Sequence, residues 1–330
     1  MMTRRELLLG GAAAFGAAAV GRPAWAATPA ASSSAVAPAE TAAARPSPFD
    51  AIIGESPAVV ALRDSLRALL DRMAGLSRPP LVLLLGETGA GKDLAAQVIH
   101  AAGPRSNGPF LDIHVPAIPR ETTDGELWGW AKGASTHPTE KSGVWEDAHG
   151  GTLYLDQIGE LGAGMLRKIR RVVETGSVRR LGDTQPRETH AWTIASCHDP
   201  YALIEKRMVE KLRAHLNPVI IRMPPLRVRR DDIQLLADHF VAEACRACDK
   251  PLMVLTPAAR DTLAEYVWPG NVRELGNMME AAVFRCEDRE ISADSLPVDP
   301  RRDAARRAEW RRRAKRRAAS AARLAGRFQR

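Results

Sequence analysis

Three glycines and a lysine between residues 86 and 92 carry the strongest chemical signal in this sequence. The run reads GETGAGK, so four residues separate Gly86 from Gly91, and Lys92 follows directly. Glycines let successive backbone N–H groups point at one anion, and a lysine adds a positive charge beside it. The spacing predicts a loop that holds nucleotide phosphates. Its residues are Gly86, Glu87, Thr88, Gly89, Ala90, Gly91 and Lys92.

Two elements must position this loop. Residues 81–85 are five consecutive apolar residues after two prolines, which indicates a strand buried on both faces. Residues 93–101 have helical spacing, so the phosphates would lie at a helix N-terminus. Such loops usually continue with Ser or Thr, which contacts magnesium, whereas this one continues with Asp93. Because strand, loop and helix follow in order, a chance glycine-rich turn is the weaker interpretation.

The rest of the chain alternates strands with helices and then becomes helical. Further strands are expected at residues 110–115, 152–155, 191–196 and 219–222, with helices at 58–73 and 165–174. Three more helices are expected at residues 233–248, 257–266 and 271–285. This order predicts an α/β three-layer sandwich with a mainly parallel sheet, followed by a small all-α C-terminal lid.

Charge is distributed unevenly along the 330 residues, whose formal net charge is +8. Residues 301–330 hold 13 Lys and Arg against 2 Asp and Glu, a net of +11, so the other 300 residues carry −3. Any contact with nucleic acid or an anionic surface should therefore be sought in this tail first. A solvated, partly helical tail is the favoured interpretation, and an electrostatic contact with nucleic acid or lipid is the alternative. A zinc site is not predicted, because Cys245 and Cys248 form a lone C-x-x-C pair within a helical pattern.

The first 26 residues have the order of an export signal. Arg4 and Arg5 precede an apolar Gly/Ala-rich run, and Ala-Trp-Ala ends at Ala26. The segment resembles a twin-arginine (Tat) signal, whose pathway exports folded proteins, and it predicts a periplasmic protein. A cytoplasmic protein with an accidental leader is the alternative. Residues 27–48 are rich in Ala, Ser and Pro, which indicates a disordered linker.

Six ordered motifs make the sequence similar to the AAA+ domain of bacterial enhancer-binding proteins, the sigma-54-dependent transcription activators. They are IIGESPA at 52–58, GETGAGKD at 86–93, ELWGWAKGA at 126–134, GGTLYLDQIGEL at 150–161, MPPLRVRRDDI at 223–233 and WPGNVREL at 268–275. The resemblance implies a P-loop AAA+ domain at residues 49–228 and a helical lid at 229–298. The basic tail, at 299–330, replaces the helix-turn-helix expected in many of these activators. An acidic residue after the P-loop lysine is usual in this family, which accounts for Asp93.

The resemblance also implies ligands and roles. The ligands would be ATP or ADP with Mg²⁺, and the domain would assemble into a homo-oligomeric ring. Ile52, Ile53 and Gly54 would border the adenine, Asp156 would organise magnesium and its water, and Arg273 would be the sensor arginine of the lid. Packing in the core is the alternative for the two isoleucines.

Several groups that hydrolyse ATP in this family are replaced here. Gln157 matches the glutamate that polarises the attacking water, and an amide has no useful basicity at neutral pH. His114 and His198 match two asparagines of the family. The two arginines that reach a neighbouring subunit are matched by Val209 and His215. Arg207 and Arg213 sit two positions early, about 200° away around a helix.

The loop that grips sigma-54 in this family, GAFTGA, reads GASTHP at residues 133–138. It has lost the aromatic residue and gained a proline, so we expect no binding of sigma-54. These departures favour a degenerate member that binds nucleotide but hydrolyses it slowly or not at all. An active ATPase that regulates transcription through sigma-54, with Gln157 compensated elsewhere, is one alternative. A nucleic-acid or anionic-surface-binding module with the P-loop domain as a scaffold is another.

Overall fold

The computed structural model describes residues 47–134, 139–198 and 203–297, together with Arg312. The export signal, nearly all of the linker, the tip of the 133–138 loop and the basic tail lie outside these residues and remain predictions. Within the described part, no helix is long and apolar enough to cross a membrane.

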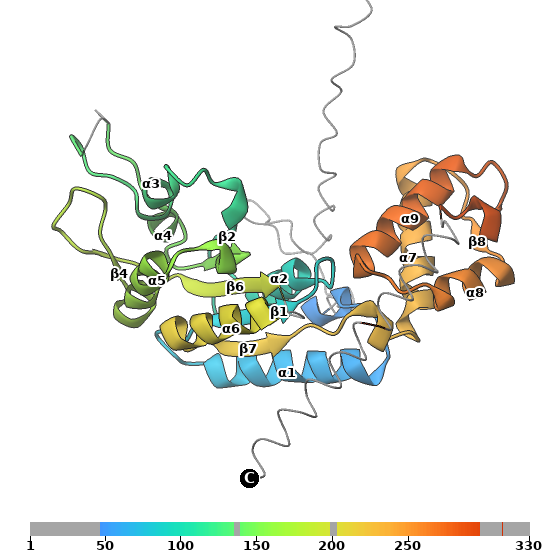
Figure 1. Cartoon of the computed structure of the whole chain (residues 1–330), viewed down its shortest axis with the longest axis horizontal. Helices are drawn as coiled ribbons and strands as arrows, with labels where there is room; N and C mark the ends of the chain where they lie inside the picture. The colour runs from blue at the N-terminus through green and yellow to red at the C-terminus, as the bar shows by residue number, and fades with distance from the viewer. Residues whose placement is uncertain (1–46, 135–138, 199–202, 298–311, 313–330) are drawn as a thin grey trace, which may run out of the picture.

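Five parallel strands form the central sheet, in the order β2-β3-β6-β1-β7. Their bounds are β1 Val82–Gly86, β2 Phe110–His114, β3 Thr152–Asp156, β6 Trp192–His198 and β7 Val219–Arg222. The register places Leu85 opposite both Cys197 of β6 and Arg222 of β7. All strands therefore end at the same edge, and in Figure 1 the arrows of β6 and β7 point toward the lid. The α/β fold with a parallel sheet is confirmed.

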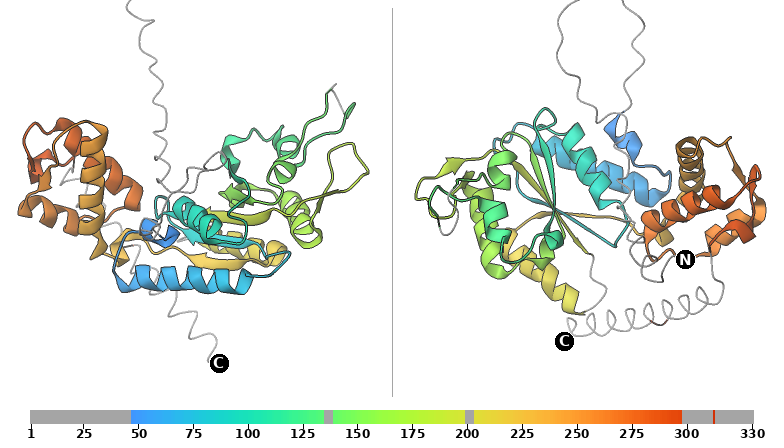
Figure 2. Two further views of the ribbon diagram at one scale, coloured as in Figure 1. Left: turned by 180° about the vertical axis from the view of Figure 1, so that it is seen from behind. Right: turned by 90° about the horizontal axis from the view of Figure 1, so that it is seen from above.

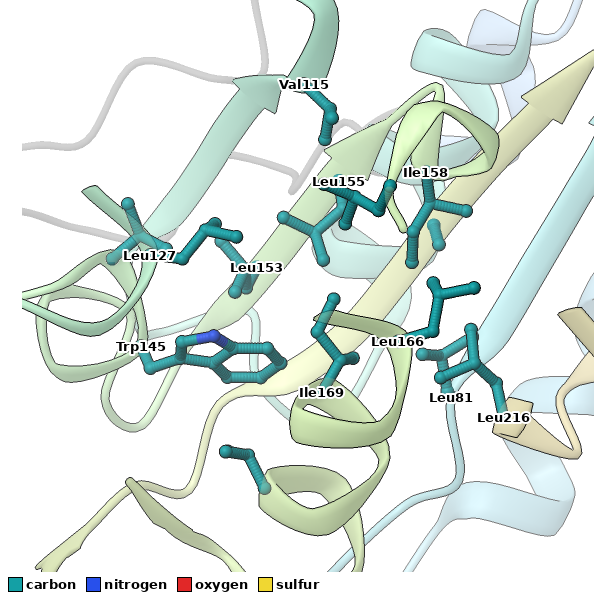
Figure 3. Close-up of a cluster of buried hydrophobic side chains, with 14 of the residues drawn as sticks. Leu81, Val115, Leu127, Trp145, Leu153, Leu155, Ile158, Leu166, Ile169 and Leu216 are labelled. Atoms are coloured by element: carbon teal, nitrogen blue, oxygen red, sulfur yellow. The ribbon is translucent and has the colours of Figure 1, made fainter. Parts of the chain in front are cut away.

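Side chains of the sheet alternate between two apolar layers, as a strand buried on both faces requires. On β1, Leu83 and Leu85 enter one cluster while Val82 and Leu84 enter the other. Figure 3 shows the first cluster, in which Leu153 and Leu155 of β3 face Trp145 and the helical Leu166 and Ile169.

Helices cover both faces and complete the three-layer sandwich (Figure 2). The first cluster is closed by α3 Thr123–Trp128, α4 Val144–Asp147, α5 Ala163–Thr175 and α6 Leu203–Leu216. The second is closed by α1 Pro57–Met73 and α2 Lys92–Ala102. Ser56 caps α1 through its side chain, which accepts from the Val59 amide, and Pro57 suits the first helical position.

The lid has a core of its own, built from α7 Asp232–Ala247, α8 Pro257–Glu265 and α9 Asn271–Arg285. An all-helical lid was expected, but the structure adds two short parallel strands, β8 Val254–Leu255 and β9 Glu290–Ile291. These strands contain only two residues each, so the sequence pattern gave no periodicity to detect. They pair the segment just before α8 with the segment that follows α9.

A small hairpin was also missed by the sequence pattern, and it consists of β4 Ser177–Val178 and β5 Arg187–Glu188. It projects beside the loop that leaves α3, as Figure 1 shows. Backbone bonds from Ala131 to Leu181 and from Leu181 to Gly129, at 3.0 and 2.9 Å, tie the bases of the two loops together. The loop matched to the sigma-54 contact therefore rests on a second loop of the same domain.

Candidate functional site

The glycine-rich loop joins β1 to α2 at the edge of the sheet that faces the lid. Gly89 has φ +73° and Gly91 has φ +96°, a region that L side chains rarely adopt. A Cβ on Gly89 would also lie 2.1 Å from the Gly270 carbonyl oxygen of the lid. Both glycines are therefore required by the backbone, and α2 begins directly after them at Lys92.

Lys92 turns back over the loop. Its Nζ donates to the carbonyl oxygens of Gly86 and Glu87, each at 2.9 Å. Burial lowers the pKa of the Lys92 ammonium, and the nearby charges of Asp93 and Asp156 act in the opposite direction. The lysine thus lies between the loop and two carboxylates, where it can neutralise a bound phosphate.

Asp156 ends β3 and is held from both neighbouring strands. His114 Nδ1 of β2 lies 2.7 Å from Oδ2, and the Ser196 hydroxyl of β6 donates to Oδ1. Burial by itself would raise the pKa of Asp156, but the hydrogen bonds from Ser196 and His114, with the charges of His114 and Lys92, lower it below its ordinary value. An ionised carboxylate with a fixed orientation results.

Gln157 follows with a left-handed backbone, at φ 59° and ψ 47°. Its amide N–H donates to Ser196 Oγ at 3.0 Å, and its side chain is exposed. His198, at the end of β6, is exposed as well. The two positions therefore open onto the same strand-end edge as Asp156, and their side chains are free to meet a ligand.

A second set of polar groups surrounds Asp93 at the start of α2. Tyr154 Oη donates to Asp93 Oδ1 at 2.8 Å, and Arg273 Nη2 of the lid lies 3.3 Å from Oδ2. Burial raises the pKa of the Tyr154 phenol, and the charges of Asp93 and Asp156 raise it further. The structure thereby brings the predicted sensor arginine to the P-loop helix.

Asp112 belongs to the same neighbourhood, and the sequence interpretation missed it. Partial burial raises the pKa of Asp112 to about 6, and the charges of Asp93 and Asp156 contribute to this shift to a smaller extent. Part of the side chain is still exposed to solvent. The sequence offered one indication, which is that Asp112 lies two residues before His114 in the same expected strand. In the structure it lies opposite Tyr154 of β3. Only the strand order shows that this position approaches α2.

Two family models match consecutive parts of the chain. The sigma-54 interaction domain matches residues 52–222, and the AAA+ ATPase lid domain matches residues 227–312. The chain belongs to the sigma-54 interaction domain family.

Curated relatives of this sigma-54 interaction domain chain are transcriptional regulators. The transcriptional regulatory protein ZraR of Salmonella typhi is 37% identical over 265 residues, which are 78% of this chain and 59% of the relative. The DNA-binding transcriptional regulator NtrC of Azospirillum brasilense is 40% identical over 241 residues, 72% of this chain and 49% of the relative. The chain thus spans about half the length of the curated relatives it matches.

Solved structures agree with this assignment. NtrX from Brucella abortus in complex with ADP has a TM-score of 0.64 at 30% identity, covering 74% of this chain and 54% of that one. The same protein in complex with ATP gives a TM-score of 0.63 with the same identity and coverage. The AAA+ fold and its lid are therefore confirmed for this member of the family.

The predicted adenine-binding segment, at the start of this sigma-54 interaction domain, lies between the core and the lid. Ile52 is buried against the α1–α2 layer, while Ile53 packs on the lid cluster. Gly54 has φ +140°, and a Cβ there would lie 2.7 Å from the Asp232 carboxylate. These contacts agree with the alternative that the two isoleucines pack in the core. They also place the segment beside α2, the helix that follows the phosphate loop.

The matched arginine positions of this family member lie on α6. His215, which occupies the position of one family arginine, is half-buried. Arg213, two positions earlier, is exposed to solvent. The side chains of Arg207 and Val209 lie outside the described part of α6 and stay a prediction from the sequence.

The residues present at the site suit a nucleotide and a divalent cation. Gly89 and Gly91 hold the left-handed backbone of the loop, and Lys92 and the helix N-terminus favour an anion. Asp156 offers an ionised oxygen ligand of the type that Mg²⁺ prefers. Gly86 to Lys92 would hold the phosphates, Asp156 would hold the cation, and a bound Mg²⁺ would offset phosphate charge.

Proposed function

We propose that this chain binds adenine nucleotide, ATP or ADP, with Mg²⁺ at the P-loop edge of the sheet. The observation that carries the proposal is the convergence of the left-handed glycines, Lys92 and the ionised Asp156 at one edge. Two solved structures of NtrX, with ADP and with ATP, support it by similarity.

Calorimetry with Mg-ATP tests this proposal on the full chain. We expect saturable heat and a raised Tm for the natural sequence, and loss of both for Lys92→Ala, which removes the phosphate-facing charge. Lys141→Ala is a matched control, because Lys141 is an exposed lysine paired with Glu126 at 2.6 Å. Absence of heat and of any thermal shift for the natural sequence contradicts the proposal.

We further propose that hydrolysis is slow. A glutamine can orient a water molecule but does not accept its proton, and Gln157 occupies the glutamate position. An arginine finger is worth roughly 10³ to 10⁵ in rate, and both matched positions carry other residues. Active hydrolysis by a homo-oligomeric ring remains the competing proposal, since the regulators that the chain resembles belong to the same family.

Sigma-54 activation is the family's function, and we propose that this member does not carry it out. The support is the sequence of the 133–138 loop, in which Ser135 replaces the aromatic residue and Pro138 restricts the chain. A reporter that measures open-complex formation at a sigma-54 promoter tests this, and activity above the vector background contradicts it.

The basic tail is the second candidate interaction region. Its net charge of +11 favours phosphate-rich partners such as nucleic acid or anionic lipid surfaces. Deletion of residues 301–330 should abolish salt-sensitive binding to DNA fragments while leaving nucleotide binding intact. Equal DNA binding before and after deletion contradicts this assignment.

A further inference from the structure

Every carbonyl group of the P-loop from Gly86 to Gly91 accepts a hydrogen bond, but the loop and its helix supply only half of the donors. Lys92 Nζ serves the carbonyls of Gly86 and Glu87 at 2.9 Å, and the Ala95 amide serves that of Gly91 at 3.0 Å. The carbonyls of Thr88, Gly89 and Ala90 take their donors from outside the loop and α2. Their partners come from more than 130 residues later in the chain.

Residues at the start of the lid and at the start of α9 supply these remaining partners. In order along the loop, the Thr88 carbonyl accepts from Asn271 Nδ2 at 3.0 Å, the Gly89 carbonyl from the Val272 amide at 3.0 Å, and the Ala90 carbonyl from an Arg229 guanidinium N–H at 3.4 Å. The first two donors lie at the start of α9. One end of the lid is therefore docked on the outer side of the phosphate loop.

Asn271 is the centre of this contact. It is fully buried and has a left-handed backbone with φ +51°. Its Oδ1 accepts from the Leu226 amide at 2.8 Å, and its Nδ2 also reaches Glu87 Oε2 at 3.2 Å. Glu87 in turn receives both guanidinium N–H groups of Arg227 at 2.5 Å, with the two side chains 11% and 10% exposed. The segment at Leu226 and Arg227, the lid and the phosphate loop are thus joined through one buried amide and one carboxylate.

Hydrogen bonds to the carbonyls of Thr88, Gly89 and Ala90 affect where the N–H groups of the same loop point. The N–H groups of a phosphate loop converge on an anion only while its carbonyls point outward. A partly buried carbonyl that loses its donor must find another, so removal of the lid donors favours loop conformations in which those carbonyls find water. Docking of the lid therefore stabilises the form of the loop that binds phosphate.

We propose that Asn271, together with the Glu87 carboxylate, is a positioning residue that keeps the P-loop in its phosphate-binding form from the lid side. This inference rests on the nucleotide binding proposed above. By linkage, nucleotide and lid docking favour each other, because each stabilises the same loop conformation. The lid then reports nucleotide occupancy independently of hydrolysis.

Asn271→Gly tests the inference in the full chain, because glycine adopts the left-handed backbone and removes only the side-chain bonds. We expect affinity for Mg-ADP to fall about tenfold, roughly the cost of one buried hydrogen bond to a polar group. We also expect faster hydrogen exchange at residues 86–91 in nucleotide-free protein. Arg260→Ala is the control: it breaks a lid ion pair with Asp238 at 2.8 Å and should change neither quantity.

The outcomes separate this inference from the binding proposal. Unchanged affinity and unchanged loop exchange in Asn271→Gly overturn the positioning role, as does an equal effect of Arg260→Ala. If the natural chain binds no nucleotide, the binding proposal fails, and loop exchange in nucleotide-free protein still decides the positioning role. Should Asn271→Gly fail to fold, Glu87→Gln replaces it. That variant should lower affinity in the same direction, and unchanged affinity overturns the inference.

Discussion

Two carboxylates of the site, Asp156 and Asp112, differ in their protonation chemistry because their surroundings differ. Asp156 receives hydrogen bonds from Ser196 and His114, which keep its pKa low. Partial burial, and then the charges of Asp93 and Asp156, raise the pKa of Asp112 to about 6. Asp156 is thus suited to hold a cation at neutral pH. Asp112 is ionised at neutral pH against its partial burial and the repulsion of Asp93 and Asp156, which costs folding free energy.

Asp112→Asn should therefore stabilise the protein at pH 8 but not at pH 4. A group whose folded pKa is raised stabilises the fold below its ordinary value, here 3.8, and loses that contribution as the pH rises through about 6. Because the side chain is largely exposed, we discount the gain to roughly 1 kcal/mol, or about 2–4 °C in Tm. Thermal melts at both pH values measure it. Asp261→Asn controls for loss of a surface carboxylate, and an equal gain at pH 4 and pH 8 contradicts the prediction.

Gln157→Glu should restore little hydrolysis by itself. The substitution supplies a carboxylate at a position next to Asp156, but the arginines expected at positions 209 and 215 are still absent. We expect Gln157→Glu to change phosphate release by less than about tenfold, and the combination with Val209→Arg and His215→Arg to raise it by roughly 10³. Phosphate release measured with Lys92→Ala as the blank checks this. Rapid release by the natural sequence contradicts slow hydrolysis.

At the scale of elements, the segment before α1 and the start of α7 are held together by one buried carboxylate. Asp232 is fully buried and accepts from the amides of Glu55 and Ser56 at 2.7 and 2.8 Å, and from the Ser56 hydroxyl at 2.5 Å. Gly54 leaves room for that carboxylate, since a Cβ would lie 2.7 Å from it. The predicted adenine-binding segment therefore depends on the lid for its position.

Asp232→Ala should be strongly destabilising. It leaves buried donors without an acceptor, at a cost of about 3 kcal/mol, which corresponds to about 6–12 °C in Tm. Asp238→Ala is the matched control on the same helix: its ion pair with Arg260 is exposed, so its loss should cost less than about 1 kcal/mol. Equal shifts in Tm for the two variants would show that Asp232 does not join the elements.

For the whole molecule, the described AAA+ body and lid account for only part of the chain. We propose that residues 1–26 direct twin-arginine export, that the domain folds before it is moved, and that a nucleotide bound inside the cell travels with it. The support is the order of Arg4-Arg5, the Ala/Gly-rich run and Ala26. The competing proposal is a cytoplasmic protein.

Replacement of Arg4 and Arg5 by lysine should hold the protein in the cytoplasm at full length, whereas the natural chain should appear in the periplasm with residues 1–26 removed. Fractionation of cells that express the chain with a C-terminal tag measures both. Lys141→Ala, a change at an exposed lysine of the folded domain, provides a control in which the leader is intact. Cytoplasmic, full-length protein for both the natural and the lysine-substituted leader refutes export.

Local sequence determined a large part of this protein. The sequence predicted each strand of the central sheet to within two residues. The inner strands β1, β3 and β6 are almost entirely buried, and strands buried on both faces need largely apolar sequence. The glycine spacing predicted the phosphate loop, and the ordered motifs predicted the family, since these features depend on neighbours along the chain. The roles of Asp156, Gln157 and Arg273 in catalysis and binding remain predictions.

Contacts between distant residues were decided only by the tertiary structure. Glu87 meets Arg227 and Asn271 across 140 and 184 residues, and Asp232 meets Glu55 across 177. Nothing in the spacing of these residues indicates a partner, because each is an ordinary polar residue within its own segment. The strand order β2-β3-β6 likewise brings His114 and Ser196 to Asp156, and only a folded sheet sets that order. The sequence by itself thus indicated the phosphate loop. Only the tertiary structure showed which residues of the lid contact that loop, because those residues are distant along the chain.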